Sequence, residues 1–285
     1  MFSKLGHYML KATLIVFAAL VILLIGMKLL VLFMEPRLTF RPTKGLTANP
    51  QDLGIPFLDL RLKPQASGLR PQALKLNAWY LTHPSPRAEI VFFHGNGGSL
   101  SHYLGLLAEM YERRFSVLAF DYRGYGESGG EPSEEGIYED SRTTVDHFWN
   151  ELYSSGKPVI YWGRSLGGIT AACAARHRQP DALVLEATFP DKQSLMRYHA
   201  LYSILAPFSS YSLSCKLFLQ SVSCPVLVIH GDRDQVVPYA LGKELFECLK
   251  GEKHFLTVPG AGHNNLAEID PERYWEKMIR FVENR

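Results

Sequence analysis

The sequence predicts an α/β fold built on a mostly parallel, doubly wound sheet, and two observations carry this prediction. Six short runs are apolar on both faces, which is typical of parallel strands covered by helices: residues 89–94, 116–121, 158–163, 182–187, 225–230 and 254–259. Between them lie longer segments with apolar residues at helical spacing: residues 99–114, 134–155, 166–178, 239–250 and 271–284. Alternation of strand and helix implies right-handed crossovers and helices on both faces of one sheet.

Two further strands are expected before this alternation begins. Residues 57–62 and 73–82 alternate apolar and polar side chains, which is the pattern of half-buried antiparallel strands. Residues 36–55 contain several prolines and no periodicity, so we expect a linker there. The 285 residues then divide into an N-terminal segment of residues 1–35, this linker, and one domain of residues 56–285.

The N-terminal segment predicts a single-pass transmembrane anchor. Residues 12–34 are apolar apart from Thr13 and Lys28, and as a helix they extend about 34 Å, against about 30 Å for a bilayer's hydrocarbon core. Lys28 is expected to reach the headgroups, and Glu35-Pro36 is expected to end the helix. A cleaved signal peptide would need a shorter apolar run and a small-residue cleavage site. Basic residues flank both ends almost equally, so both orientations stay open.

Composition argues against several other classes of protein. A net charge of +2 without a basic patch does not suit a nucleic-acid-binding protein. The four cysteines form no C-x-x-C pair, which argues against a zinc site, and no metal or organic cofactor is expected. Cys215 and Cys224 are close enough in sequence to bridge, but unpaired thiols are the preferred interpretation. The sequence does not predict the oligomeric state.

Ser165 is the candidate nucleophile because it lies in GRSLGG, between a predicted strand and a predicted helix. Gly163 and Gly167 flank it and permit the sharp turn that lifts a serine hydroxyl clear of a sheet. A serine that only caps the helix is the alternative interpretation. The nucleophile therefore needs a base, an acid and an oxyanion hole elsewhere in the chain.

His263 is the candidate base and Asp234 the candidate acid. His263 lies in a glycine-rich loop beyond the last strand, at the edge where ligands of open α/β sheets bind. Asp232 and Asp234 both follow the preceding strand; Asp234 has the longer reach, and Asp232 is expected to shape a turn. His94 and His230 end strands before glycines and are also expected to shape turns. A carboxylate that orients the imidazole lets it take the serine proton.

The oxyanion hole is expected at the backbone amides of Asn96 and Leu166. Asn96 lies in HGNGGS, a loop of small residues after a strand, and Leu166 directly follows the candidate nucleophile. Amides placed in this way donate to a developing oxyanion. A plain glycine-rich turn is the alternative, and a phosphate-binding loop is disfavoured because no lysine follows the glycines.

Residues 189–222 are too long for one helix and rich in Leu, Tyr and Phe, which predicts a small lid over the carboxyl edge of the sheet. Residues 195–208 carry more apolar surface than a solvent-facing loop needs. This surface either packs on the helices of the sheet or, through Leu201 and Leu205, lines an acyl-binding groove above Ser165 or rests against the bilayer.

In chain order, the segments HGNGG, DYRGYGESGG, GRSLGG, HGDRDQVVP and GAGHNN resemble the α/β-hydrolase superfamily. The resemblance covers roughly residues 56 to 285 and is greatest to the membrane-anchored abhydrolase-domain branch, which includes bacterial hydrolases and depalmitoylating thioesterases. It implies an α/β-hydrolase fold with a small helical lid, and a triad of Ser165, Asp234 and His263 with the same two amides as the hole. It also implies a loop that braces the site, shaped by Asp121, Arg123, Gly124 and Gly126.

Three functions remain open at this point. The first is a membrane-anchored serine hydrolase that cleaves carboxylic esters or thioesters through an acyl-enzyme, on a small-molecule or lipid-like acyl substrate. The second is a serine peptidase or amidase of the same fold, which ranks lower because no acidic cluster is evident near the predicted site to hold a free amine. The third is a non-catalytic ligand-binding protein that keeps the fold.

Overall fold

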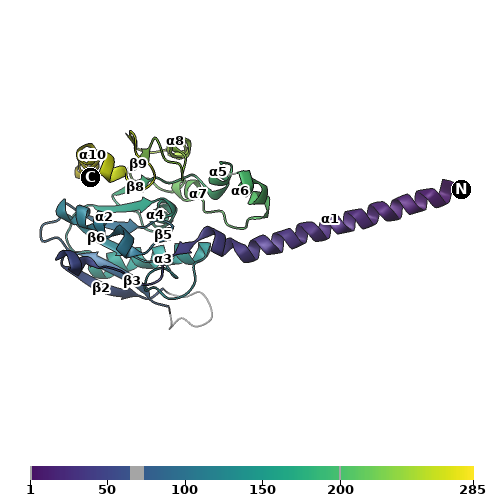
Figure 1. Ribbon diagram of the computed structural model, residues 1–285. Coiled ribbons are helices and arrows are strands. Elements are labelled where there is room, and N and C mark those ends of the chain that lie inside the picture. Colours follow the sequence, from purple (N-terminus) through teal and green to yellow (C-terminus); the bar gives the residue numbers. More distant parts are fainter. Residues whose placement is uncertain (1, 65–73, 199) are drawn as a thin grey trace.

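The computed structural model describes residues 2–64, 74–198 and 200–285. In these residues, eight strands form one sheet in the order β10-β9-β8-β7-β4-β6-β3-β2 (Figure 1). The strands are β2 (Phe57–Leu62), β3 (Leu76–Leu81), β4 (Ala88–Phe93), β6 (Phe115–Phe120), β7 (Val159–Arg164), β8 (Ala182–Glu186), β9 (Val226–Gly231) and β10 (Lys253–Val258). β3 pairs antiparallel with both β2 and β6. The other neighbouring pairs, from β6 through β4, β7, β8 and β9 to β10, are parallel. The predicted fold class is therefore confirmed.

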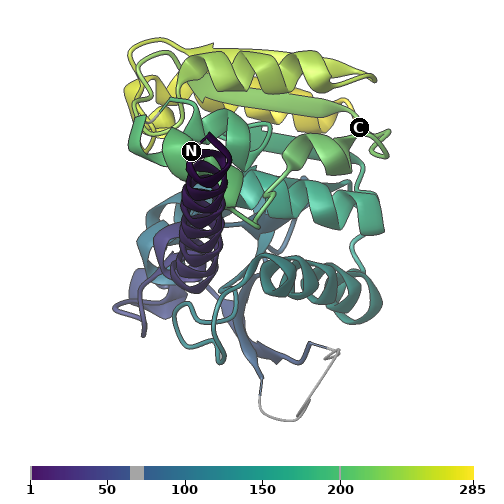
Figure 2. The same cartoon turned by 90° about the vertical axis from the view of Figure 1, so that its right-hand side faces the viewer.

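Helices cover both faces of the sheet, as the two-sided apolar pattern of its strands requires (Figures 1 and 2). One core lies under α2 and α10, and the other lies under α3, α4 and α8. These helices are α2 (Leu100–Glu112), α3 (Glu134–His147), α4 (Leu166–His177), α8 (Tyr239–Cys248) and α10 (Pro271–Glu283). The segment predicted as one helix over 134–155 becomes α3 followed by a π-helical turn, Phe148–Leu152.

Two strands differ from the burial that their sequences predict. β3 is buried along its whole length rather than half-buried, because it lies between β2 and β6 and contributes to both cores. Residue 73, at the start of the expected strand, lies outside the described residues. β10 is an edge strand, so only Leu256 and Val258 are fully buried there. The partial exposure of β10 thus follows from its position at the edge of the sheet, which no local sequence pattern encodes.

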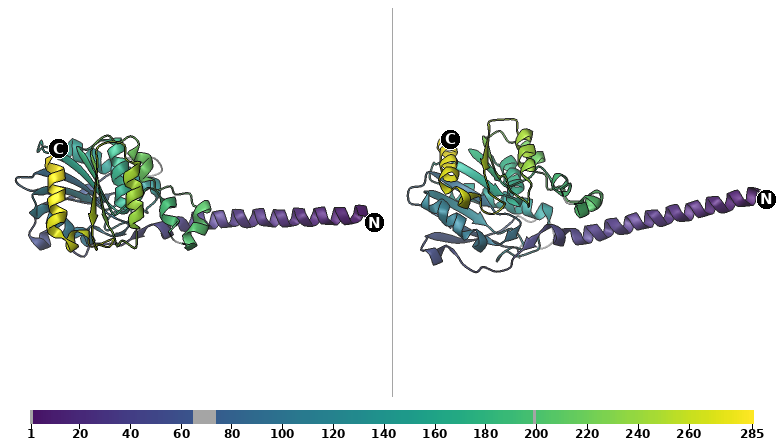
Figure 3. Two further views of the ribbon diagram at one scale, coloured as in Figure 1. Left: turned by 90° about the horizontal axis from the view of Figure 1, so that it is seen from above. Right: turned by 45° about the horizontal axis from the view of Figure 1, so that its top comes forward.

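The N-terminal helix α1 (Phe2–Thr39) extends away from the domain as a single rod (Figures 1 and 3). From Gly6 to Thr39 it is long and apolar enough to cross a membrane by length and composition, and little of that stretch is buried. The expectation that Glu35-Pro36 ends the helix is wrong, since α1 continues through Pro36. A proline removes one intrahelical donor, and the last turn is retained because Glu35 and Thr39 bind other parts of the domain.

The segment expected to be a linker packs on the domain instead. It contains a two-residue strand, β1 (Arg41–Pro42), and a 3₁₀ helix, η1 (Pro50–Leu53), and the side chain of Phe40 is buried, with its ring 5.8 Å from that of Tyr211. β1 pairs in parallel with β5 (Gly97–Gly98), which lies in the loop predicted to form the oxyanion hole.

Among the residues expected to form a lid, those that the structure describes contain four short helical elements. They are α5 (Lys192–Met196), α6 (Ala200–Leu205), η3 (Ala206–Phe208) and α7 (Cys215–Leu219). α5 and α6 lie beside the end of α1 that joins the domain (Figures 1 and 3). α7 packs on α4, and its residues Cys215 and Leu219 belong to the core of the domain. Only the first part of the segment therefore lies where a lid would.

Candidate active site

Ser165 lies at the sharp turn between β7 and α4, at the carboxyl edge of the sheet. Its backbone has φ 55° and ψ −118°, in a region that residues with a Cβ rarely adopt. A Cβ on Gly163 would lie 2.1 Å from the backbone oxygen of Gly167, and a Cβ on Gly167 would lie 1.9 Å from that of Phe93. Glycine is thus required on both sides, because α4 begins directly against the ends of β4 and β7.

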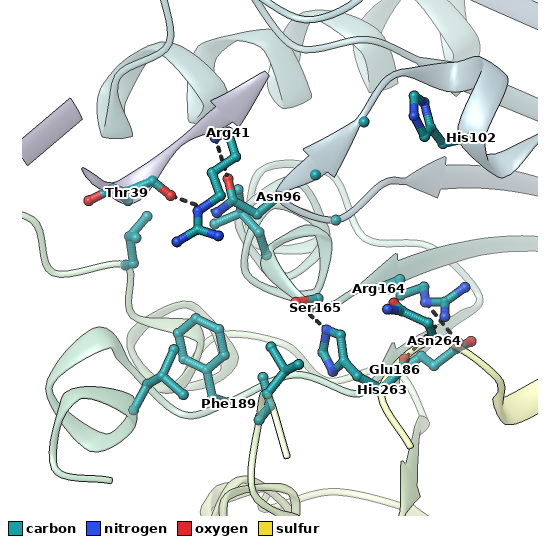
Figure 4. Close-up of a pocket in the computed structure, with 18 of the residues that line it drawn as sticks. Thr39, Arg41, Asn96, His102, Arg164, Ser165, Glu186, Phe189, His263 and Asn264 are labelled. Atoms are coloured by element: carbon teal, nitrogen blue, oxygen red, sulfur yellow. Dashed lines mark hydrogen bonds and ion pairs between the residues drawn. The ribbon is translucent and has the colours of Figure 1, made fainter. Parts of the chain in front are cut away.

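The hydroxyl of Ser165 faces His263, which comes from the loop after β10 (Figure 4). His263 Nε2 lies 3.1 Å from Ser165 Oγ, and His263 Nδ1 lies 2.7 Å from Asp234 Oδ2. This arrangement assigns the imidazole proton to Nδ1, since a carboxylate only accepts, and leaves Nε2 free to accept the serine proton. Asp232 faces elsewhere and accepts the Gly260 amide at 2.7 Å. The structure therefore brings together Ser165, His263 and Asp234, and does not bring in Asp232.

Both carboxylate oxygens of the buried Asp234 are occupied. Oδ1 accepts the amides of Val236 and Val237 at 2.9 and 2.8 Å, and Oδ2 lies 3.3 Å from His230 Nε2 in addition to its contact with His263. Burial by itself raises the pKa of this carboxyl, but the hydrogen bonds from His230, His263 and the Val237 amide outweigh it. The pKa of Asp234 therefore lies well below its ordinary value, and the group is a carboxylate at any working pH.

His230 is a residue whose position the sequence reasoning missed. It was expected to shape a turn, yet it is fully buried at the end of β9. Its Nε2 lies 2.8 Å from the Val237 carbonyl oxygen and 3.3 Å from Asp234 Oδ2. Both neighbours are acceptors, so Nε2 is assigned the proton. A histidine four residues before the candidate acid in IHGDRD was the available signal.

Asn96 and Leu166 line the pocket beside Ser165. In the described part of the chain, neither backbone amide donates to a protein acceptor. Such unpaired donors at the start of α4 and in a glycine-rich loop are what a developing oxyanion needs. Their use as an oxyanion hole remains a prediction.

The segment after α1 holds the loop of Asn96 in place. The Asn96 side chain donates from Nδ2 to the Thr39 carbonyl at 2.6 Å, and its Oδ1 accepts from the Tyr125 hydroxyl at 2.9 Å and from the Arg41 amide at 3.3 Å. Figure 4 shows Thr39 and Arg41 beside Asn96 at one side of the pocket. The candidate oxyanion loop is thus tied to the end of the N-terminal helix, which sequence periodicity did not indicate.

A pocket of about 1070 Å³ surrounds Ser165 and His263. Its apolar end lies between α1 and the first part of the predicted lid, and its apolar side chains are Val31, Leu38, Phe189, Leu195, Met196, Leu205 and Leu213. Leu205, one of the two residues that would line an acyl groove if the segment forms one, is thus among the lining residues. The side chain of Leu201 lies outside the described residues.

The other end of the pocket is polar and contains acidic residues, although no acidic cluster is evident in the sequence near the predicted site. Glu109, Glu186 and Glu268 line this end. Glu186 pairs with Arg164 at 3.4 Å (Figure 4), and Glu109 accepts the indole N–H of Trp275 at 2.8 Å. Two of these three carboxylates are therefore already engaged. They come from α2, β8 and α9 (Leu266–Ile269), so no cluster of acidic residues in the sequence indicated that they meet here.

The loop expected to brace the site is built around the buried Asp121. Its Oδ1 accepts the Leu100 amide at 2.9 Å and its Oδ2 accepts Asn77 Nδ2 at 3.3 Å, which ties the start of α2 to the loop. A Cβ on Gly126 would lie 2.1 Å from Asp121 Oδ2, so glycine is needed there. Burial raises the pKa of Asp121 to about 7. The nearby His94 Nε2, 3.7 Å away, has its pKa lowered by burial to about 4.

No cluster of three or more His, Cys, Asp or Glu side chains is placed to hold a metal ion in the residues that the structure describes. All four cysteines, including Cys215 and Cys224, are free thiols. Burial raises the pKa of Cys224 to about 12, and that of the fully buried Cys215 is also raised. Neither thiol has the lowered pKa of a reactive cysteine.

The sheet, the turn at Ser165 and the order of the three polar residues define an α/β-hydrolase, and comparisons with known proteins agree. A family model described as "Serine aminopeptidase, S33" matches residues 84–214. An uncharacterized protein of Mycobacterium tuberculosis is 32% identical over 214 residues, which cover 73% of this chain and 75% of that protein. The chain belongs to the α/β-hydrolase superfamily, in its abhydrolase-domain branch.

Other similar proteins have more informative names. An uncharacterized membrane protein of Saccharomyces cerevisiae is 29% identical over 247 residues, covering 82% of each chain. The lysophosphatidylserine lipase ABHD12 of Macaca fascicularis is 31% identical over 191 residues, covering 60% of this chain and 48% of that protein. The solved structure of a Pyrococcus furiosus esterase has the same fold, with a TM-score of 0.69 and 22% identity over 86% of this chain and 98% of that one.

Proposed function

We propose that the chain is a membrane-anchored serine hydrolase that cleaves carboxylic esters or thioesters through an acyl-enzyme. The observation that supports this most is the unbroken series of contacts from Ser165 Oγ through His263 to Asp234, at 3.1 and 2.7 Å, inside a large pocket. Membership of the α/β-hydrolase superfamily, in which the same three residue types occur in the same chain order, adds to it.

The reaction follows from this geometry. Ser165 Oγ attacks the acyl carbonyl carbon while His263 Nε2 takes the hydroxyl proton, and Asp234 stabilises the imidazolium that forms. The carbonyl oxygen becomes an oxyanion, which accepts hydrogen bonds from the backbone amides of Asn96 and Leu166. When the tetrahedral intermediate collapses, the bond to the leaving group breaks, and His263 returns its proton to the alcohol or thiol. A water molecule then attacks the acyl-enzyme by the same steps, which release the acid and restore Ser165.

The apolar end of the pocket supports an acyl substrate of some length. Its apolar side chains include Leu205, and the charged groups beside them, Glu35 and Lys192, are paired with each other. The name of the ABHD12 relative, a lysophosphatidylserine lipase, supports a lipid-like substrate, and that of the Pyrococcus esterase supports ester cleavage. The ester or thioester is expected to place its carbonyl at Ser165 and its chain in this end.

Anchoring in a membrane is part of the same proposal. α1 has the length and apolar composition of a membrane span, and the yeast relative is named a membrane protein. On expression of the full chain, we expect it to remain in the membrane pellet after carbonate washing and to be released by detergent. Recovery in the carbonate supernatant would contradict single-pass anchoring.

Hydrolysis of aminoacyl amides is the second candidate, because Glu268 lines the polar end of the pocket and forms no ion pair within the described residues. A free amine placed near a carboxylate is what an aminopeptidase requires, and the matching family model carries that description. The engagement of Glu109 and Glu186 by other groups leaves less charge for this purpose than an amine site needs.

One panel separates these functions. The full chain, purified in detergent micelles, is offered p-nitrophenyl esters, acyl-thioesters and aminoacyl amides, with Ser165→Ala as the control. The proposal predicts turnover of esters or thioesters that Ser165→Ala lacks. Turnover of amides alone would favour the peptidase, and a wild type that binds these compounds without releasing product would favour the non-catalytic protein.

A further inference from the structure

One side of the N-terminal helix α1 contacts the domain, which its apolar composition alone does not indicate. Lys28, Val31, Glu35 and Leu38 recur at helical spacing and lie on one side of α1. Val31 and Glu35 are buried and Leu38 is 46% exposed, and all three line the pocket, whereas Leu29 and Phe33, on the opposite side, are more exposed. The last three turns of α1 therefore form a wall of the pocket, and do not serve only to connect the domain to a membrane.

Glu35 is the residue that fastens this wall to the first part of the lid. Its side chain is 3% exposed, which is unusual for a carboxylate unless it is paired and hydrogen-bonded. Oε1 accepts Lys192 Nζ at 2.7 Å and also contacts the Ser209 hydroxyl, while Oε2 accepts the Ser210 amide at 2.9 Å. The Tyr211 amide reaches Oε1 at 3.2 Å. One carboxylate thus holds both the start of α5 and the segment after η3.

Two further contacts act in the same place. Lys28 Nζ donates to the Phe208 carbonyl at 2.8 Å, so it binds the lid segment and does not extend toward headgroups as the sequence suggested. Lys192 Nζ also donates to Thr39 Oγ1 at 3.2 Å, and the Thr39 carbonyl accepts Asn96 at 2.6 Å. The last turns of α1 therefore join the lid to the candidate oxyanion loop.

We infer that Glu35 determines acyl-chain specificity by holding the lid against α1 as the outer wall of the acyl end of the pocket. The inference rests on the proposed ester hydrolysis. A short acyl group occupies only the space next to Ser165, whereas a long one extends between Leu38 on α1 and Leu205 on the lid. Loss of the Glu35 contacts separates these two surfaces, so long chains lose apolar contact and short chains lose little. Glu35 is a specificity-determining residue and takes no part in the chemical step.

The position of this contact also sets the depth of the membrane span. Residues 6–26 of α1 are exposed throughout, while Lys28 contacts the domain. From Gly6 to Gly26, this exposed stretch extends about 32 Å as a helix, enough for a hydrocarbon core of about 30 Å. The lid and the acyl end of the pocket then lie at the bilayer surface. A chain leaving the bilayer would meet the wall formed by α1 and the lid first.

The test measures kcat/KM of the full chain in micelles against p-nitrophenyl esters from two to twelve carbons. Glu35→Gln should lower the ratio of long-chain to short-chain kcat/KM at least tenfold. Lys192→Gln should have the same effect, and the double variant should be no worse than either single one, because the two residues act through one contact. Arg37→Gln is the matched control, since Arg37 lies two residues away on the exposed face over the Phe33 ring.

Each outcome decides the matter. A lowered melting temperature with an unchanged chain-length profile in Glu35→Gln and Lys192→Gln would show a purely structural ion pair and overturn the inference, while ester hydrolysis itself stands. An equal change in Arg37→Gln would assign the effect to charge near the micelle and also overturn it. A wild type that hydrolyses no ester of the series overturns this inference, and it overturns the proposed function as well if acyl-thioesters are not hydrolysed either.

Discussion

Replacement of Asp234 by Asn tests the assignment of the acid most sharply, because Asp232 offers a matched control two residues away. In Asp234→Asn, the amide can still accept the amides of Val236 and Val237, which hold the side chain at 2.9 and 2.8 Å. The group that faces His263 Nδ1 then becomes an N–H₂ donor. His263 Nδ1 must then accept this hydrogen bond, so the imidazole proton lies on Nε2, opposite Ser165. In this tautomer Nε2 cannot take the serine proton.

The expected magnitude follows from this change of tautomer. Loss of the orienting carboxylate with intact geometry costs about 10⁴-fold in kcat in a Ser-His-Asp protease, or about 5 kcal/mol of barrier, and we expect a loss of the same order here. Asp232→Asn keeps the oxygen that accepts the Gly260 amide at 2.7 Å, so its kcat should stay within tenfold of the wild type.

The assay is steady-state hydrolysis of a short p-nitrophenyl ester, with thermal unfolding of each variant to establish that it is folded. A folded Asp234→Asn that keeps more than a tenth of the wild-type kcat would refute the reasoning. So would the reverse pattern, in which Asp232→Asn carries the large loss.

Three further outcomes are expected. Leu205→Ser should flatten the gain of about three- to fourfold in kcat/KM per added methylene, while a lower melting temperature with unchanged chain preference would make Leu205 structural only. His230→Leu should lower kcat about tenfold because Asp234 loses a hydrogen-bond donor 3.3 Å away. His230→Gln should recover part of the lost kcat, and an equal loss in both variants would argue against a role for the hydrogen bond from residue 230 to Asp234. Burial raises the pKa of Asp121 to about 7, so the folded state keeps a proton that the unfolded chain releases near pH 4. Relative to Asp121→Asn, the wild-type free energy of unfolding should therefore fall by up to about 1.4 kcal/mol per unit between about pH 4 and pH 7, and parallel curves for wild type and Asp121→Asn would contradict this.

The sequence predicted the sheet closely because parallel strands buried on both faces leave a signal that needs no tertiary information. β4 (Ala88–Phe93) and β9 (Val226–Gly231) begin and end within a residue of the apolar runs that predicted them. Ser165, Asp234 and His263 could be chosen for a related reason. Ser165 directly follows a recognisable strand, Asp234 and His263 lie in the loops after two others, and the carboxyl ends of these strands meet at one edge of the sheet.

What the sequence did not predict depends on contacts between distant segments. Glu35 reads as the polar end of an apolar helix, and only its partners on the lid, more than 150 residues later, give it a place in the pocket. The two residues of β1 are too few for any periodicity, and their strand exists because β5 lies alongside. Glu109 and Glu268 approach the site from different helices. One local signal did indicate the side of α1 that faces the pocket, namely the helical spacing of Lys28, Val31, Glu35 and Leu38.

Fluorophosphonate labelling of the full chain tests the central claim, that Ser165 is an activated nucleophile, most directly. The probe reacts only with a serine whose proton a neighbouring base can take, so the account predicts one adduct, located by mass spectrometry on the peptide that contains Ser165. Labelling should be absent in Ser165→Ala and strongly slowed in His263→Ala, with Asp232→Asn labelled at the wild-type rate. An adduct on another residue, or equal labelling of Ser165→Ala, would contradict the account.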